Sequence, residues 1–195
     1  KVTTMSKTPT AESSQFLPRE FLSPNKNQPG ISKTVFSHVS NLHGLLGDWS
    51  RLRDKGTRFF RAVSSLKLYE CNDDYFPSQL KPLMENLVEI LDSLKDVVEA
   101  TKLIQTQVQA LAKIPPFDAP VISTWTARQI SENIDKIYNS MEKEYRLKII
   151  VTENIAHCRD ESLIEVYASS WELEPYLSSE SSAYLFADIG ISGVT

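Results

Sequence analysis

Glu153 and His157 are the two side chains whose types and spacing best suit metal chemistry in this sequence. One helical turn would separate them, so a carboxylate and an imidazole could reach the same ion. Two ligands do not make a site, because a structural zinc ion needs four. Cys71 and Cys158 stand outside any Cys-x-x-Cys or Cys/His pattern, so the sequence predicts two reduced thiols and no metal.

The sequence motifs of common catalytic sites are not found either. There is no phosphate-binding GxxxxGK(S/T) loop, no GxSxG nucleophile turn and no HExxH zinc motif. We therefore expect a protein that is not an enzyme and holds no cofactor. An enzyme whose site is assembled from scattered residues stays open as an alternative, and a polar cavity with perturbed carboxylates would indicate one.

An apolar heptad repeat between Leu80 and Leu111 organises the chain. Nine of its ten seam positions are apolar, and Thr101 is the polar one. Such a repeat lines one face of a helix that packs lengthwise against a partner helix, here about 50 Å long. The seam consists of Leu80, Leu83, Leu87, Ile90, Leu94, Val97, Thr101, Ile104, Val108 and Leu111.

Three further segments carry helical signals. A stripe from Val35 to Leu66 predicts the first long helix, and Gly56 within it indicates a kink or a close helix crossing. Thr126 has capping-box spacing with the glutamine three residues later, and Asp160 resembles an N-cap. We assign the buried stripe of the third helix to Ile130, Ile134, Ile137, Met141, Tyr145, Ile149 and Ile155, and that of the fourth to Leu163, Val166 or Tyr167, and Ser170 or Trp171.

The predicted fold class is all-α: a long antiparallel helical hairpin or coiled coil with additional C-terminal helices. A short break between the two long helices makes them antiparallel neighbours, and a proline-rich extended connector leads to the third helix. We expect a disordered Ser/Pro-rich arm over 1–32, an elongated bundle over 33–175 with helices at about 33–69, 78–113, 126–157 and 160–172, and a Ser-rich loop with an apolar tail over 176–195. The tail is apolar enough to dock, on the hairpin or on another chain.

Aromatic side chains near the C-terminal helices are candidate contacts for partners. Because Pro175 turns the chain after the short helix, we expect Trp125, Tyr167, Trp171 and Tyr176 to cluster. Tryptophans on apolar stripes usually pack in a core, and exposed interface anchors are the second explanation. Whether the cluster is core or docking surface stays open at this point.

Basic residues provide a second set of candidates. One face of the first helix carries Arg51, Lys55, Arg58 and Arg61, and it is either a solvated face or a docking face for an acidic protein or RNA. Acidic side chains on the second helix could face these residues. In the arm, Ser23 and Thr8 precede proline as proline-directed kinases require, and phosphorylation would weaken docking on an acidic surface.

Charge limits the classes of partner. The net charge is −4, with eleven Lys/Arg against five Asp/Glu in residues 1–70 and one against seven in residues 156–195. The net negative charge of the chain argues against direct nucleic-acid binding as its main function. No apolar run approaches the roughly eighteen residues of a membrane helix, so we expect no membrane contact.

Two blocks of residues resemble the cyclin-dependent kinase 2-interacting protein family. They cover about residues 38–70 and 123–190, whereas the middle helix is similar in character only and the arm differs. The blocks consist of His43-Gly44-Leu45, Trp49, Leu52, Asp54, Gly56 and Leu66-Lys67-Leu68, then Thr124-Trp125, Glu144, Lys148, Val151, Ala156-His157, Asp160, Leu163, Tyr167, Trp171 and Pro175-Tyr176.

The resemblance implies a non-enzymatic adaptor in the nucleus, with the cytoplasm as a second compartment. Its implied partners are cell-cycle kinases, the ATR-interacting checkpoint protein and an AAA-type ATPase complex. The implied processes are DNA replication, ATR checkpoint signalling and ribosome biogenesis. The alternative is a structural coiled-coil subunit of a tethering or kinetochore assembly, which a homodimer through the heptad seam would favour.

Overall fold

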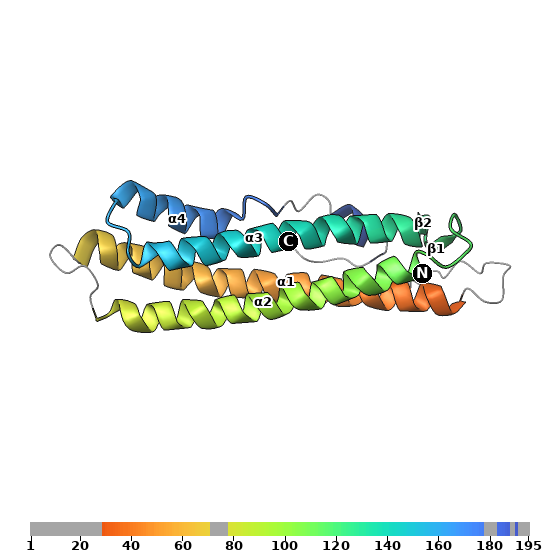
Figure 1. Cartoon of the computed structure of the whole chain (residues 1–195), viewed down its shortest axis with the longest axis horizontal. Coiled ribbons are helices and arrows are strands. Elements are labelled where there is room, and N and C mark those ends of the chain that lie inside the picture. Colours follow the sequence, from red (N-terminus) through yellow and green to blue (C-terminus); the bar gives the residue numbers. More distant parts are fainter. Residues whose placement is uncertain (1–28, 71–77, 178–182, 188–189, 191–195) are drawn as a thin grey trace, which may run out of the picture.

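Three long helices run side by side along the length of the molecule in the computed structural model (Figure 1). The structure describes residues 29–70, 78–177, 183–187 and 190. Its elements are α1 (Pro29–Ser65) with a terminal π-helical turn η1 (Leu66–Glu70), α2 (Leu80–Leu111), β1 (Pro120–Ile122), β2 (Trp125–Thr126), α3 (Ala127–Ile155) and α4 (Glu161–Leu173).

The all-α prediction is confirmed for the described residues. Within the seam of α2, eight of the ten predicted positions are buried, and α2 packs against both α1 and α3 of the same chain. Thr101 keeps its polar group satisfied there, since its hydroxyl donates to the Val97 carbonyl at 2.8 Å. The seam therefore packs within the chain, which removes the reason to expect a homodimer through it.

Helix starts follow the capping signals of the sequence. The Thr126 hydroxyl accepts from the Gln129 amide at 3.2 Å, and the Gln129 side chain accepts from the Thr126 amide at 2.9 Å. Asp160 accepts from the Leu163 amide at 3.0 Å. The start of α1 differs from expectation, because residues 29–32, predicted to lie in the arm, form its first turn. Proline at the first helical position is well tolerated.

The connector before α3 also differs from the prediction. It contains a small antiparallel hairpin of β1 and β2, in which Ile122 pairs with Trp125 and Ser123 takes a left-handed φ of 50° at the turn. This hairpin lies at one end of the bundle, and the loop from α3 to α4 lies at the other (Figure 1). The rest of the arm, with Ser23 and Thr8, lies outside the described residues, as does Cys71.

α4 packs against α1 and α3. Beyond it, residues 183–187 form a helical turn that buries Leu185 and Phe186. The Phe186 ring meets the His43 ring of α1 edge-on, with centroids 5.0 Å apart. Residues 183–187 of the predicted apolar tail thus dock on their own chain. Among the described helices, none has the length and apolar character to cross a membrane.

A buried ion cluster beneath an exposed helix face

The core of the C-terminal half of α3 holds charged residues where the sequence suggested tyrosine and isoleucine. The seam continues from Met141 through Glu144 and Lys148, both 0% exposed. Tyr145 and Ile149, which we expected in the core, are half-buried. The heptad spacing continues along α3 without a break, but Glu144 and Lys148 occupy two of its positions. A search for apolar residues alone therefore selects Tyr145 and Ile149, which lie on the neighbouring face.

Lys148 lies at the centre of this cluster. Its ammonium group donates to the Trp171 carbonyl oxygen at 2.7 Å and pairs with Glu174 Oε1 at 3.1 Å. Glu144 Oε1 is more distant, at 3.7 Å. The same ammonium lies 4.6 Å from the centroid of the Trp171 ring, within the range of a cation–π contact. Each of these interactions offsets part of the free-energy cost of burying the ammonium group, because water does not solvate it there.

Glu174 connects this lysine to α1. Its carboxylate accepts from Trp49 Nε1 at 2.8 Å and from Arg53 Nη1 at 3.2 Å. The residue is the C-cap of α4 in a left-handed conformation, with φ 49° and ψ 64°. Such a conformation costs a non-glycine residue roughly 1–2 kcal/mol. The carboxylate's three partners hold Glu174 in this conformation, which a glycine would otherwise favour.

Trp171 completes the packing of α4 on α1. Its indole stacks on Phe60, with centroids 5.1 Å apart, and its Nε1 donates to the Arg53 carbonyl at 3.3 Å. A Cβ added at Gly56 would lie 2.7 Å from Cε2 and 2.9 Å from Nε1 of that ring. Gly56 therefore marks a close helix crossing, as the sequence suggested. We call Trp49, Arg53, Glu144, Lys148, Trp171 and Glu174 together the buried ion cluster.

We expect Gly56→Ala to lower the free energy of unfolding by about 1–3 kcal/mol, because the indole is enclosed and has to shift. Gly47→Ala is the matched control, since a Cβ there meets nothing within 4 Å and alanine favours a helix. Urea denaturation of both variants measures the difference. Equal stabilities would contradict the close contact between α1 and α4.

Burial shifts two pKa values in the cluster in opposite directions. Burial lowers the pKa of Lys148, although Glu174 and Glu144 act to raise it. Burial also raises the pKa of Glu144, against the hydrogen bond that the Tyr176 amide donates to Oε2 at 3.0 Å. The other oxygen, Oε1, is buried and accepts no hydrogen bond from the described residues. Glu144 is thus the least satisfied member of the cluster.

This arrangement predicts a pH dependence that Glu144→Gln removes. Between the ordinary pKa of 4.5 and the raised value in the fold, native Glu144 holds a proton that the unfolded chain has lost. Stability from this group therefore falls as pH rises from 4.5 through that range. In urea titrations, we expect the free energy of unfolding of the wild-type chain to fall relative to that of Glu144→Gln over this interval. A difference that is constant or grows with pH would contradict the assignment.

The candidate contact residues named from the sequence do not form one cluster. Trp125 lies on β2 at the opposite end of the bundle from the start of α4 (Figure 1). Trp171 is 0% exposed, so it belongs to the core and is not an exposed anchor. Tyr167 is half-buried and Tyr176 is 50% exposed. The prediction of a four-residue aromatic cluster was wrong, because Trp125 precedes the N-terminal end of α3 whereas Trp171 meets Lys148 in the C-terminal half of that helix.

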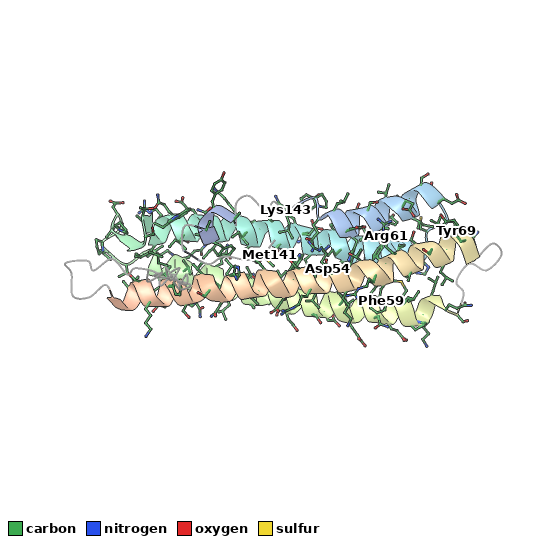
Figure 2. The ribbon with its side chains drawn as sticks, turned by 180° about the vertical axis from the view of Figure 1, so that it is seen from behind. Asp54, Phe59, Arg61, Tyr69, Met141 and Lys143 are labelled. Carbon is green, nitrogen blue, oxygen red and sulfur yellow. The ribbon has the colours of Figure 1, made fainter. Side chains whose placement is uncertain are left out.

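The basic face of α1 is only partly as expected. Arg51, Lys55 and Arg58 are exposed, and Arg51 pairs with Asp48 of its own helix. Arg61, however, pairs with Glu165 at 3.2 Å and Glu172 at 2.7 Å, both on α4. Figure 2 shows Arg61 where α1 runs beside α4. The acids that meet this basic face thus come from α4, where we had expected them from the second helix.

An exposed apolar stripe covers the outer side of α4. Leu163 is 39% exposed, Val166 54% and Leu173 77%. The opposite side of the helix buries Ile164, Ala168 and Trp171. We call Leu163, Val166 and Leu173 the α4 stripe. The sequence assignment of Leu163 to the buried side was wrong, because α4 packs through the neighbouring face. Of the alternatives Val166 or Tyr167 and Ser170 or Trp171, the structure buries Trp171 and half-buries Tyr167.

Metal binding finds no support at Glu153 and His157. They line a groove between α2 and α3, and the described residues contain no group of three or more His, Cys, Asp or Glu able to hold a metal ion. Cys158 is a free thiol. In the buried ion cluster, Glu144, Lys148 and Glu174 are buried and Arg53 is partly exposed, and together they tie α1, α3 and α4 to one another.

The fold and its surfaces define an elongated all-α bundle with an apolar stripe exposed on α4. No protein-family model matches the chain. It is similar to the human cyclin-dependent kinase 2-interacting protein, with 22% identity covering 84% of this chain and 91% of that protein. The bovine protein of the same name is 21% identical over 82% and 89%, and the mouse protein 23% over 79% and 85%.

These comparisons confirm the resemblance that the two residue blocks indicated. Residues that carry the resemblance lie far apart in sequence and meet in or against the buried ion cluster: Trp49, Gly56, Glu144, Lys148, Trp171 and the backbone of Tyr176. Arg53 and Glu174 were missed by the sequence reading. The left-handed conformation just before Pro175 was not recognisable from a glutamate, which rarely adopts it.

Proposed function

We propose that this chain is a non-enzymatic adaptor that binds a cyclin-dependent kinase through the α4 stripe. The curated relatives are named for interaction with cyclin-dependent kinase 2. The observation that carries the proposal is the exposure of Leu163, Val166 and Leu173 on a helix anchored from beneath by buried charges. Exposed apolar groups gathered on one face mark protein interaction sites more often than scattered ones do.

The rigidity of α4 supports the same role. A docking helix that is already ordered loses little conformational entropy on binding. Glu174 fixes the C-terminal end of α4, and the ion pairs of Arg61 fix the side facing α1. Tyr176, half exposed beyond that end, is a further candidate contact. An acidic segment of the partner would be attracted by Arg51, Lys55 and Arg58, which would raise the association rate more than the affinity.

We further propose that the adaptor works in nuclear complexes of DNA replication, ATR checkpoint signalling and AAA-ATPase-linked ribosome biogenesis. The family resemblance supports these assignments, together with the ATR-interacting protein and the ATPase as partners. Phosphorylation of Ser23 and Thr8 would adjust the charge of the N-terminal segment. Fractionation of cells that express the tagged chain, followed by identification of co-purifying proteins, tests this part.

We expect Val166→Ser with Leu173→Ser to reduce capture of purified cyclin-dependent kinase 2 at least about tenfold, which corresponds to the loss of about 1.4 kcal/mol of binding free energy. Both side chains are exposed, so the melting temperature should change little. Leu103→Ser is the matched control, because Leu103 is 59% exposed on α2, away from the stripe. Undiminished capture by the double variant would place the contact elsewhere, and failure of the wild-type chain to capture the kinase would refute this partner.

A further inference from the structure

The groove between α2 and α3 is the second apolar surface of the bundle. It encloses about 470 Å³. Met84, Val88 and Leu91 line it from α2, and Tyr145 and Ile149 line it from α3. Val88 is 52% exposed, although valine is more often buried. The groove is therefore largely apolar, and Asp92, Thr152, Glu153 and His157 also line it.

α4 shows what such a groove accommodates. It packs against α1 and α3, on the other side of α3 from α2 (Figure 1). The turn at 183–187 packs near His43 of α1. No described helix occupies the equivalent position between α2 and α3. Side chains of parallel or antiparallel helix pairs form ridges and grooves that accept a further helix in this way.

Charge indicates the kind of helix that fits. Asp92 on the α2 wall and Glu153 on the α3 wall both line the groove, and no lysine or arginine among the described residues does. Asp96 and Glu99 lie close by, because both, after burial and Asp92, contribute to the raised pKa of Tyr145. Lys95 offsets part of this charge through its pair with Glu99 at 3.8 Å. Acids on both sides of an apolar floor complement a helix with basic flanks.

We propose that the α2–α3 groove binds a basic amphipathic helix of a partner protein. Apolar residues one turn apart would enter between Val88 and Ile149, and lysine or arginine on either side would pair with Asp92 and Glu153. The α3 wall from Tyr145 to His157 rises about 18 Å, so the bound helix has about twelve residues. This proposal deepens the adaptor function, on which it rests, by adding a surface distinct from the α4 stripe.

The test uses the full ¹⁵N-labelled chain and a synthetic peptide of about fourteen residues, with leucines at i, i+3, i+4 and i+7 and lysines elsewhere. We expect the amide signals of Val88 and Ile149 to shift on titration. Asp92→Lys with Glu153→Lys should weaken binding at least about tenfold. Glu132→Lys is the matched control, since Glu132 lines a different cavity at the other end of α3. A scrambled peptide of the same composition should bind much more weakly.

Four outcomes would overturn the proposal. The peptide shifts could map to the α4 stripe or elsewhere, or the double charge reversal could leave the affinity unchanged. Sedimentation could show a dimer that Val88→Asp dissociates, making a second copy the occupant. Phe16→Ser with Phe21→Ser could tighten peptide binding, making the chain's own N-terminal segment the occupant. None of these measurements involves the kinase, so failure of kinase capture leaves the groove result standing, and the reverse also holds.

Discussion

Lys148→Met is expected to lower the free energy of unfolding by about 3–5 kcal/mol. Methionine nearly preserves the volume and apolar stem of lysine, so the change removes the ammonium and little else. Glu174 Oε1 then loses an ion pair of 3.1 Å, and the Trp171 carbonyl loses its donor at 2.7 Å. Glu174 keeps its contacts with Trp49 and Arg53, but it loses the fully buried cation of the pair, and breaking a buried ion pair from one side costs more than the pair's net contribution to stability.

Thermal and urea denaturation measure this loss, and Lys143→Met on the outer surface of α3 provides the control (Figure 2). A loss of this size corresponds to a drop of about 10 °C in a chain of this length, whereas the control should change by less than about 0.5 kcal/mol. Adding Glu174→Gln to Lys148→Met should cost less than the sum of the two single changes, because both remove the same ion pair. Equal stabilities of the Lys148 and Lys143 variants would contradict the role of the buried ion cluster.

The bundle itself was predictable from the sequence because most of its core obeys the periodicity rule. The α2 seam needed only apolar side chains at heptad spacing, and the caps at Thr126 and Asp160 are local signals that tertiary packing leaves intact. These features depend on residues within one or two turns of each other. Local rules therefore set the number, direction and approximate ends of the helices.

The buried ion cluster was not predictable by the same rule. Glu144 and Lys148 occupy seam positions of α3, and a hydrophobicity pattern treats both as surface residues. Their burial depends on Glu174 and Arg53, which come from other helices and become neighbours only after folding. The resemblance to a known family did point to Glu144 and Lys148, but it offered no reason for their presence. Long-range charge pairing provides that reason.

The buried side of α4 was only partly predicted for a related reason: Trp171, one of the alternatives, is buried, whereas Leu163 is exposed. Leu163 and Val166 have the same apolar character as Ile164 and Ala168, so composition does not decide which side of a short helix faces the bundle. The structure shows that Trp171, with its contacts to Phe60 and Gly56, fixes the rotation of the helix. The exposed α4 stripe is thus a consequence of one large side chain being buried.

Trp171→Ala should therefore lower the free energy of unfolding by about 3–5 kcal/mol, the usual cost of truncating a buried tryptophan. The variant loses three contacts of the indole: the stack on Phe60, the hydrogen bond to the Arg53 carbonyl and the cation–π contact with Lys148. Because these contacts hold α4 on α1, hydrogen exchange should rise most in α4. The α2 seam, which packs on α1 and α3, should stay protected near its wild-type level until global unfolding dominates.

Trp171→Ala also distinguishes a packing role of Trp171 in the core from a role as a contact residue for the kinase. At a temperature where Trp171→Ala is still folded, binding of the kinase should fall in proportion to the loss of order in α4, and a substitution that refills the site, Trp171→Phe, should restore both together. Val166→Ser with Leu173→Ser should instead lose binding while α4 stays protected from exchange. If Trp171→Ala lost binding with its melting temperature and exchange unchanged, the indole would have to be a contact residue, which its complete burial contradicts.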